Sequence, residues 1–201
     1  MGATAAEVIL ALPERFEVIA NVRSTLLIAS VASITAAGYA DAYFAALPTQ
    51  FHATLRDAVA GVWMPVEVAM AHYSACSAIG LPREALARIG RTVGEKTQGT
   101  LLGTAVRMAR EAGVTPWTVL PQFQRFWNRA YDGGGIAVYK LGPKEARLEV
   151  YKAPPLDTTY YRTALGGLAA GVIELFCTRA YVHERPGARA PASAVFRAQW
   201  V

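Results

Sequence analysis

The sequence is poor in cysteine, histidine and charged residues. Its 201 residues include only two cysteines, Cys76 and Cys177, and three histidines, and charged residues make up 17%. Two cysteines so far apart exclude a disulfide framework and a cysteine-rich zinc site, and they fit a reducing compartment. The low charge, together with 53% hydrophobic residues, excludes intrinsic disorder as the dominant state. We expect a core-rich cytoplasmic protein.

Long apolar runs are also missing. The uncharged segment 24–40 is shorter than the roughly 20 apolar residues that span a bilayer, so the sequence predicts no transmembrane helix. The first residues include Glu7 and Glu14 and lack a basic stretch ahead of an apolar one, which argues against a secretory signal.

Positive charge is unevenly distributed. Residues 1–82 hold three Lys or Arg and six Asp or Glu, whereas residues 83–201 hold seventeen and nine. A basic surface can mark nucleic acid, but these cations are dispersed, which favours a solvated surface. A nucleic-acid-associated regulator that uses the basic 83–201 part stays open as an alternative. Its cations would be Arg88, Arg91, Lys96, Arg107 and Arg110.

Residue spacing predicts the elements. In the first part we expect a marginal helix over 4–12, a strand over 16–33, and helices over 36–47, 51–60 and 65–79. Helices over 83–98, 99–111 and 115–130 follow. Alternating residues then predict a strand hairpin over 136–151, helical spacing predicts a helix over 158–178, and a second hairpin is expected over 180–201.

These elements predict an α+β fold. N-terminal helices precede an antiparallel sheet of about four to five strands packed against a long C-terminal helix. We expect a single domain over 1–201, with an N-terminal strand and helical part over 1–80 and a ligand-binding-like α+β part over 81–201.

Glycines recur at helical spacing in two of the predicted helices. Gly90 and Gly94 lie four residues apart, as do Gly167 and Gly171. Glycine in a helix interior costs about 0.5–1 kcal/mol relative to alanine, so both rows indicate close packing. The row of Gly90 and Gly94 predicts the close approach of a neighbouring helix, and the row of Gly167 and Gly171 predicts close contact with the sheet or with another chain. We assign them, with Glu174, to a homodimer interface. We expect Arg179 or Arg162 to neutralise Glu174.

The order of elements over 80–201 resembles a superfamily of known domains. The similarity is carried by the segments 90–95 (GRTVGE), 165–171 (LGGLAAG) and 195–200 (VFRAQW). The superfamily includes haem-nitric-oxide-binding-like domains, the vinyl reductase-like domain and TRAPP subunits of the Bet type. Within it, the chain resembles a myxobacterial domain family of unknown function. The resemblance implies a homodimeric α+β domain that senses a small apolar ligand or docks partner proteins.

The sequence departs from the cofactor sites of that superfamily. Vinyl reductase-like domains bind zinc through a cysteine cluster near their C-terminal strands, and residues 178–201 contain no cysteine. We therefore expect no zinc. Haem-binding members use a Tyr-x-Ser-x-Arg set, which is missing, so the sequence argues against haem. Whether the protein holds any other cofactor is unknown from the sequence.

Catalytic and metal sites are not predicted. His52, His72 and His183 are far apart in sequence, and His183 and Glu184 would point to opposite faces of a strand. A nucleophile made of Cys76 or Cys177 with a histidine stays open, although buried structural cysteines are the more common case. We incline to a non-enzymatic protein.

Aromatic residues concentrate over 117–131. They could line an apolar pocket, with Arg125, Arg129 or His183 as polar anchors for a carboxylate or acyl head group, although core packing would also explain them. The predicted ligand-binding residues are Phe123, Phe126, Trp127, Tyr131, Tyr161 and His183.

We therefore predict a regulatory, sensor-type signalling domain. As a homodimer, it would bind either a small apolar ligand, acyl or haem-like, or a partner protein. A ligand would act by binding more tightly to one packing of the helices or of the dimer than to another. Besides the nucleic-acid alternative, a protein-docking or scaffold module without a ligand stays open.

Overall fold

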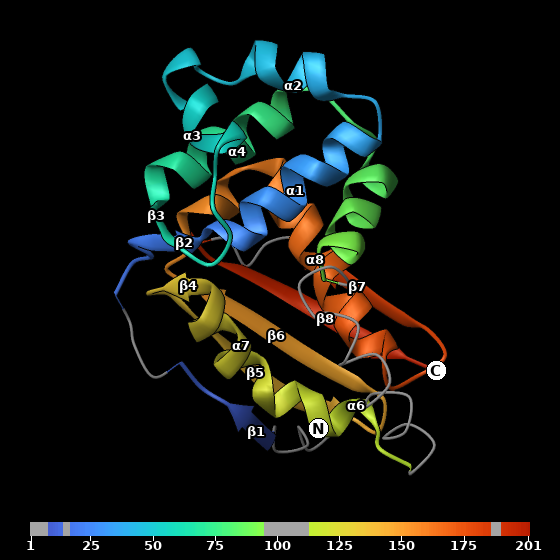
Figure 1. The fold of residues 1–201 in the computed structure, drawn as a ribbon. Helices are drawn as coiled ribbons and strands as arrows, with labels where there is room; N and C mark the ends of the chain where they lie inside the picture. Colours follow the sequence, from blue (N-terminus) through green and yellow to red (C-terminus); the bar gives the residue numbers. More distant parts are fainter. Residues whose placement is uncertain (1–7, 14–16, 95–112, 186–189) are drawn as a thin grey trace.

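A computed structural model describes residues 8–13, 17–94, 113–185 and 190–201. It confirms the predicted α+β class: helices lie above and in front of an antiparallel sheet (Figure 1). The sheet has five strands in the order β1-β5-β6-β8-β7. These are β1 (Val8–Ala11), β5 (Gly135–Gly142), β6 (Glu145–Tyr151), β8 (Ala194–Trp200) and β7 (Ala180–Glu184).

The two predicted hairpins supply four of the five strands of this sheet. β5 pairs with β6, and β7 pairs with β8, both antiparallel. In β6 and β8 every second residue is buried, beginning with Ala146 and Ala194. This period of two gives the sheet one dry face, on which the remaining layer of the protein packs.

Helices form the N-terminal layer, shown at the top of Figure 1. They are α1 (Ser24–Ala36), α2 (Ala40–Ala46), a 3₁₀ turn η1 (Thr49–Phe51), α3 (His52–Arg56) and α4 (Val66–Ala78). A small sheet in the order β3-β2-β4 joins this layer to the rest, through β2 (Asn21–Arg23), β3 (Trp63–Pro65) and β4 (Tyr131–Asp132).

The predicted strand over 16–33 is wrong for most of its length. Only Asn21–Arg23 is a strand, and Ser24 begins α1. Ser24, Leu27, Ser30 and Ile34 are buried at spacings of three and four, which is the helical period. Two of these four buried residues are serines, so a search for apolar periodicity does not detect the helix.

The predicted helix over 4–12 is also wrong where the structure describes it. Val8–Ala11 is a strand that pairs with β5, with Val8 opposite Lys140. Its hydrogen-bond partners lie about 130 residues away in sequence, and this tertiary pairing overrides a weak local preference. The predicted helix over 99–111 lies outside the described residues, as do Lys96, Arg107 and Arg110.

The C-terminal part contains one predicted helix that is interrupted and one that is continuous. The helix predicted over 115–130 is interrupted: α6 (Pro116–Val119) leads into the 3₁₀ turn η2 (Leu120–Gln122), which contains Pro121, and then into α7 (Phe123–Ala130). After the short turn η3 (Pro154–Asp157), α8 (Thr159–Glu174) is continuous, and the Thr158 side chain accepts a hydrogen bond from the Tyr161 backbone N–H at its start.

The glycine rows bring two helices of the same chain together. A Cβ atom on Gly90 would lie 2.0 Å from the Ala164 carbonyl oxygen, and one on Gly167 would lie 2.1 Å from the Ala87 carbonyl oxygen. The helix over 83–94 therefore crosses α8 backbone to backbone. This confirms the neighbouring helix predicted at Gly90 and Gly94, whereas the partner predicted at Gly167, the sheet or another chain, is wrong. The homodimer stays a prediction that these glycines no longer support.

Glu174 lies at the end of the same crossing. Its carboxylate forms an ion pair with Arg91 and also accepts a hydrogen bond of 3.1 Å from the Ala180 backbone N–H. The predicted partners were wrong, because Arg162 pairs with Glu184 at 3.1 Å and Arg179 extends over the Tyr181 ring. Glu174 thus connects the helix over 83–94, α8 and β7.

In the described part of the chain, no helix combines the length and the apolar character that a membrane crossing requires.

Candidate functional site: an apolar cavity between two helices and the sheet

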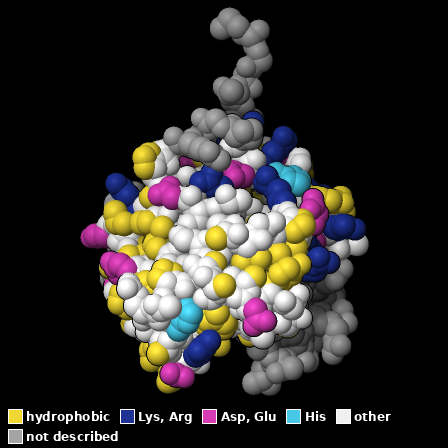
Figure 2. Space-filling view, turned by 90° about the horizontal axis from the view of Figure 1, so that it is seen from above, with side chains coloured by type: hydrophobic (Ala, Val, Ile, Leu, Met, Phe, Trp, Pro, Cys, Tyr) yellow, Lys and Arg dark blue, Asp and Glu magenta, His cyan; other side chains and the backbone are white. Residues whose placement is uncertain are grey.

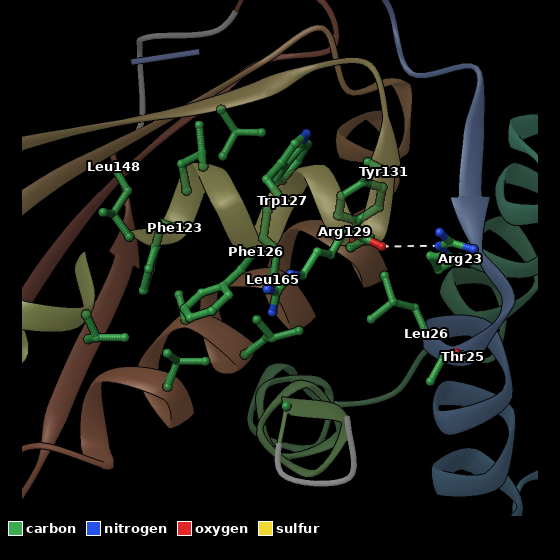
Figure 3. Close-up of a pocket in the computed structure, with 18 of the residues that line it drawn as sticks. Arg23, Thr25, Leu26, Phe123, Phe126, Trp127, Arg129, Tyr131, Leu148 and Leu165 are labelled. Atoms are coloured by element: carbon green, nitrogen blue, oxygen red, sulfur yellow. Dashed lines mark hydrogen bonds between the residues drawn. The ribbon is translucent and has the colours of Figure 1, made fainter. Parts of the chain in front are cut away.

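A cavity of about 500 Å³ lies between α7, α8 and the dry face of the sheet. Its size falls in the range of about 300–1,000 Å³ that is typical of small-molecule sites. The start of α1 closes one end, as Figure 3 shows for Arg23, Thr25 and Leu26. The walls are formed mainly by aliphatic and aromatic side chains of three elements: Phe123, Phe126, Trp127 and Ala130 of α7; Leu165, Leu168, Ala169 and Val172 of α8; Ile136, Leu148, Val150 and Phe196 of the sheet.

Strand register builds the floor of the cavity. Leu148 of β6 lies opposite Phe196 of β8, and Val150 lies opposite Ile136 of β5. Residues two apart on a strand share a face, so these four side chains point to the same side of the sheet. Leu148 and Val150 are each only 1% exposed.

Helical spacing builds the α7 wall. Phe123, Phe126, Trp127 and Ala130 follow the i, i+3, i+4, i+7 pattern and so lie along one face. Two hydrogen bonds fix this helix to the turn and the strand that follow it: the Trp127 indole N–H donates to the Gly133 carbonyl of the turn at 3.0 Å, and the Ile136 backbone N–H of β5 donates to Gln124 Oε1 at 2.7 Å.

Four of the six predicted ligand-binding residues line the cavity, namely Phe123, Phe126, Trp127 and Tyr131. Tyr161 lies outside the lining; it is buried with its ring centroid 6.3 Å from that of Tyr131 and 4.8 Å from that of Tyr73 of α4. His183 is exposed on β7, also outside the lining.

Sequence reasoning missed the sheet floor and the walls from α8 and α1. The alternation of Leu148 and Val150 was recognised, but only as the dry face of a hairpin. The apolar row of α8 was recognised, including Leu165, Leu168 and Val172, but it was interpreted as core. The α1 end was missed because residues 16–33 were expected to be a strand. The helical spacing of Ser24, Leu27, Ser30 and Ile34 was the signal that could have found it.

Two cations stand among the lining residues, and they differ in what they contact. Arg23 is held in place: its Nη1 donates to the Gly61 carbonyl at 2.7 Å, its Nε donates to the Arg129 carbonyl at 3.4 Å, and its guanidinium lies 3.9 Å from the Trp63 ring centroid. The guanidinium of Arg129 has no hydrogen-bond or ion-pair partner among the described residues. In Figure 3 the Arg129 side chain extends from α7 toward Phe126 and Leu165.

Tyr131 supplies the phenol of the cavity wall. Burial raises the pKa of Tyr131 to about 12, while the neighbouring Tyr161 acts in the opposite direction on that pKa. The phenol is therefore neutral at physiological pH and can serve as a hydrogen-bond donor or acceptor. Its ring packs on Trp127 with a centroid separation of 4.3 Å.

A second polar cluster lies in the N-terminal layer, away from the cavity. His72 is fully buried; its Nδ1 is 2.8 Å from the Tyr43 hydroxyl, and its Nε2 is 2.8 Å from Ser30 Oγ. Ser30 Oγ in turn lies 2.5 Å from the Tyr160 hydroxyl of α8. Desolvation lowers the pKa of His72 to about 3, so the imidazole is neutral and can satisfy one donor and one acceptor.

Cys76 lies one helical turn from His72, and its sulfur is 3.7 Å from His72 Nε2. This i, i+4 pair could have been found from the sequence. Burial raises the pKa of the Cys76 thiol, which disfavours the nucleophilic thiolate. No cluster of three or more His, Cys, Asp or Glu suited to a metal ion occurs in the ranges that the structure describes.

Comparison with known proteins gives a fold and no family. No family model matches the chain, and no curated protein matches it. Solved structures do match, at 12% identity and over 89% of this chain. One comes from work on haem redox potential modulated through protein-induced porphyrin distortion (TM-score 0.56, 99% of that chain), and one from work on haem distortion in the H-NOX family (TM-score 0.55, 94%). A third concerns the mechanism of H-NOX activation (TM-score 0.52, 96%). The chain therefore has a fold similar to that of H-NOX domains.

Proposed function

We propose that this protein is a sensor-type domain that binds an apolar small molecule in the cavity between α7, α8 and the sheet. The observation that carries the proposal is the composition of the walls, which are aliphatic and aromatic side chains with very few polar groups. Ligand sites of this size are usually lined in this way, with a few polar groups that fix orientation.

Haem is the ligand that the fold would suggest, and the residues do not fit it. Haem iron is held by an axial His, Cys, Met or Tyr. All three histidines and both cysteines of the sequence lie in the described ranges, and none of them lines the cavity. No methionine is among the described lining residues either. Tyr131 offers the one oxygen donor of that set among the described lining residues, and burial raises its pKa to about 12, which disfavours the phenolate that would bind iron. We therefore propose a ligand other than haem.

The position of the cavity suits a sensor. Its walls come from α7, α8, the sheet and the start of α1, and Gly94 of the helix over 83–94 also contributes. A ligand that touches all these elements can favour one packing of the two layers over another, which is the requirement for any effector. Signalling and a partner protein are parts of this proposal.

Native mass spectrometry tests the proposal. The protein purified from its own cells is sprayed gently and then under denaturing conditions, and we expect an extra mass that is released on denaturation. A Leu168→Trp variant, which fills the cavity from α8, should lose this mass, whereas Tyr181→Trp on the exposed part of β7 should retain it. Phe126→Ala at the 41% exposed rim should reduce occupancy without a risk to folding. Absence of any ligand from the wild-type protein, followed by failure of apolar molecules to bind it, would contradict the proposal.

The same spectra report stoichiometry, so they also test the homodimer, which we keep as a proposal together with cytoplasmic location and the myxobacterial domain family.

A nucleic-acid-associated role is the rival to the proposed function. On the face shown in Figure 2, which looks down on the N-terminal layer, Lys and Arg are interspersed with Asp and Glu, so this face offers no uniformly basic surface to a phosphate backbone. DNA retention that falls steeply with salt would favour the rival.

A further inference from the structure

We propose that the ligand is an apolar chain that ends in a single carboxylate, and that Arg129 binds this carboxylate at the mouth of the cavity. This inference rests on the proposed function, since it requires that the cavity bind a ligand. It specifies which end of the ligand lies where and which side chain recognises it.

The cavity is graded from a dry floor to an accessible rim. The floor residues Leu148 and Val150 are almost completely buried, whereas Phe126 on the opposite wall is 41% exposed and Arg129, one turn further along α7, is also exposed. An apolar chain gains most free energy where water is excluded, and a charged group costs least where water is accessible. The gradient therefore orients an amphipathic ligand with its chain on the sheet and its head group beside Arg129.

The charged residues of the cavity lining favour a ligand with a negatively charged head group. The described residues that line the cavity include two arginines and no Asp or Glu. Arg23 already donates to two carbonyls and stacks on Trp63, so its role is to hold the end of α7 against the loop at Gly61. Arg129 is the lining cation whose donors are unused among the described residues, and its side chain extends over the cavity in Figure 3.

The geometry of a guanidinium favours a carboxylate in particular. Arginine presents parallel N–H donors that match the two oxygens of a carboxylate, and such charge-assisted pairs are stronger than neutral hydrogen bonds. A single accessible cation suits one negative charge. The ligand class is therefore a monocarboxylic acid with an aliphatic or aromatic body.

Calorimetric titration with decanoate and with decan-1-ol tests this inference, because the two probes share a chain length and differ in charge. We expect the wild-type protein to bind decanoate about tenfold or more tightly than the alcohol, as expected for one charge-assisted pair. Arg129→Gln should abolish that preference and leave the affinity for the alcohol unchanged. Arg125→Gln, one turn earlier on α7 and outside the cavity lining, is the matched control and should behave as wild type.

The outcomes separate the two proposals. If wild type binds both probes equally, or if Arg129→Gln keeps the preference for decanoate, the carboxylate inference is wrong and the apolar cavity stands. If neither probe binds wild type while the protein is folded by circular dichroism, the proposed function fails and this inference fails with it. Loss of the preference in the Arg125→Gln variant as well would show a general surface charge effect and would overturn the role of Arg129.

Discussion

Gly167→Ala is expected to destabilise the protein strongly, by about 3 kcal/mol or more. The new methyl group would lie 2.1 Å from the Ala87 carbonyl oxygen and 2.8 Å from its carbon, and both are backbone atoms that no side-chain rotation can move away. The helix over 83–94 would have to separate from α8, and the Arg91–Glu174 ion pair at the same crossing would be strained. Urea denaturation monitored by circular dichroism measures this loss directly.

The matched substitution Gly171→Ala, one turn later in α8, is expected to change the stability of the protein in the opposite direction. A Cβ on Gly171 would meet Arg91 atoms at 3.5 Å or more, which is ordinary van der Waals contact. Because alanine has a higher helix propensity than glycine, Gly171→Ala should stabilise the protein by up to about 1 kcal/mol. Equal effects of the two substitutions would contradict the backbone-to-backbone crossing. Gly90→Ala repeats the test from the other helix, since its Cβ would lie 2.0 Å from the Ala164 carbonyl oxygen.

Stability is expected to fall as pH decreases below about 6.5, because of His72. Burial lowers the pKa of His72 from 6.5 to about 3 in the folded protein. Between these two values the unfolded state binds a proton that the folded state does not, so acid favours unfolding. The contribution of His72 is complete above pH 6.5 and is lost progressively toward pH 3, at up to about 1.4 kcal/mol per pH unit.

Urea denaturation curves at several pH values between 7 and 4 check this expectation. Carboxylates also titrate near the acid end, so the measurement requires a variant that lacks the imidazole. His72→Gln should be less stable than wild type at pH 7, because it disturbs the bonds to Tyr43 and Ser30, and it should lose most of the slope between pH 6.5 and 5. The exposed His183→Gln should keep the slope. A wild-type stability that is flat over that interval would show that His72 is accessible to protons in the folded state.

The buried polar network and the cavity are adjacent along α8. Tyr160 ends the hydrogen-bond series from Tyr43 through His72 and Ser30, whereas Tyr161, the next residue, packs beside Tyr131 of the cavity wall. The start of α8 thus contacts the N-terminal layer with one side chain and the surroundings of the cavity with the next. This arrangement would connect the ligand binding that we propose directly to the N-terminal helices.

The C-terminal half of the fold was predictable from local patterns. Alternation in β6 and β8 and the regular spacing of Leu165, Leu168 and Val172 in α8 identify strands and helix, because each of these elements buries one apolar face. The aromatic residues over 117–131 likewise predicted four residues that line the cavity, three in α7 and Tyr131 in β4. In the N-terminal half the same approach identified α2 and α4 but failed for α1, which buries Ser30 and Ser33, and for β1, which depends on pairing with a distant strand.

By itself the sequence determined the α+β class, the hairpins, the close approach of glycine-bearing helices and the aromatic wall, because these follow from periodicities of two and 3.6 residues. Tertiary structure alone decided whether that wall would enclose a cavity or a filled core, since this depends on how far α7 and α8 stand apart over the sheet. It also decided that the glycine rows meet within one chain and that Arg91 neutralises Glu174. In the same way it decided that Arg23 is engaged by backbone carbonyls, while the Arg129 guanidinium has no hydrogen-bond or ion-pair partner among the described residues. These outcomes depend on distances between residues remote in sequence, which no local pattern encodes.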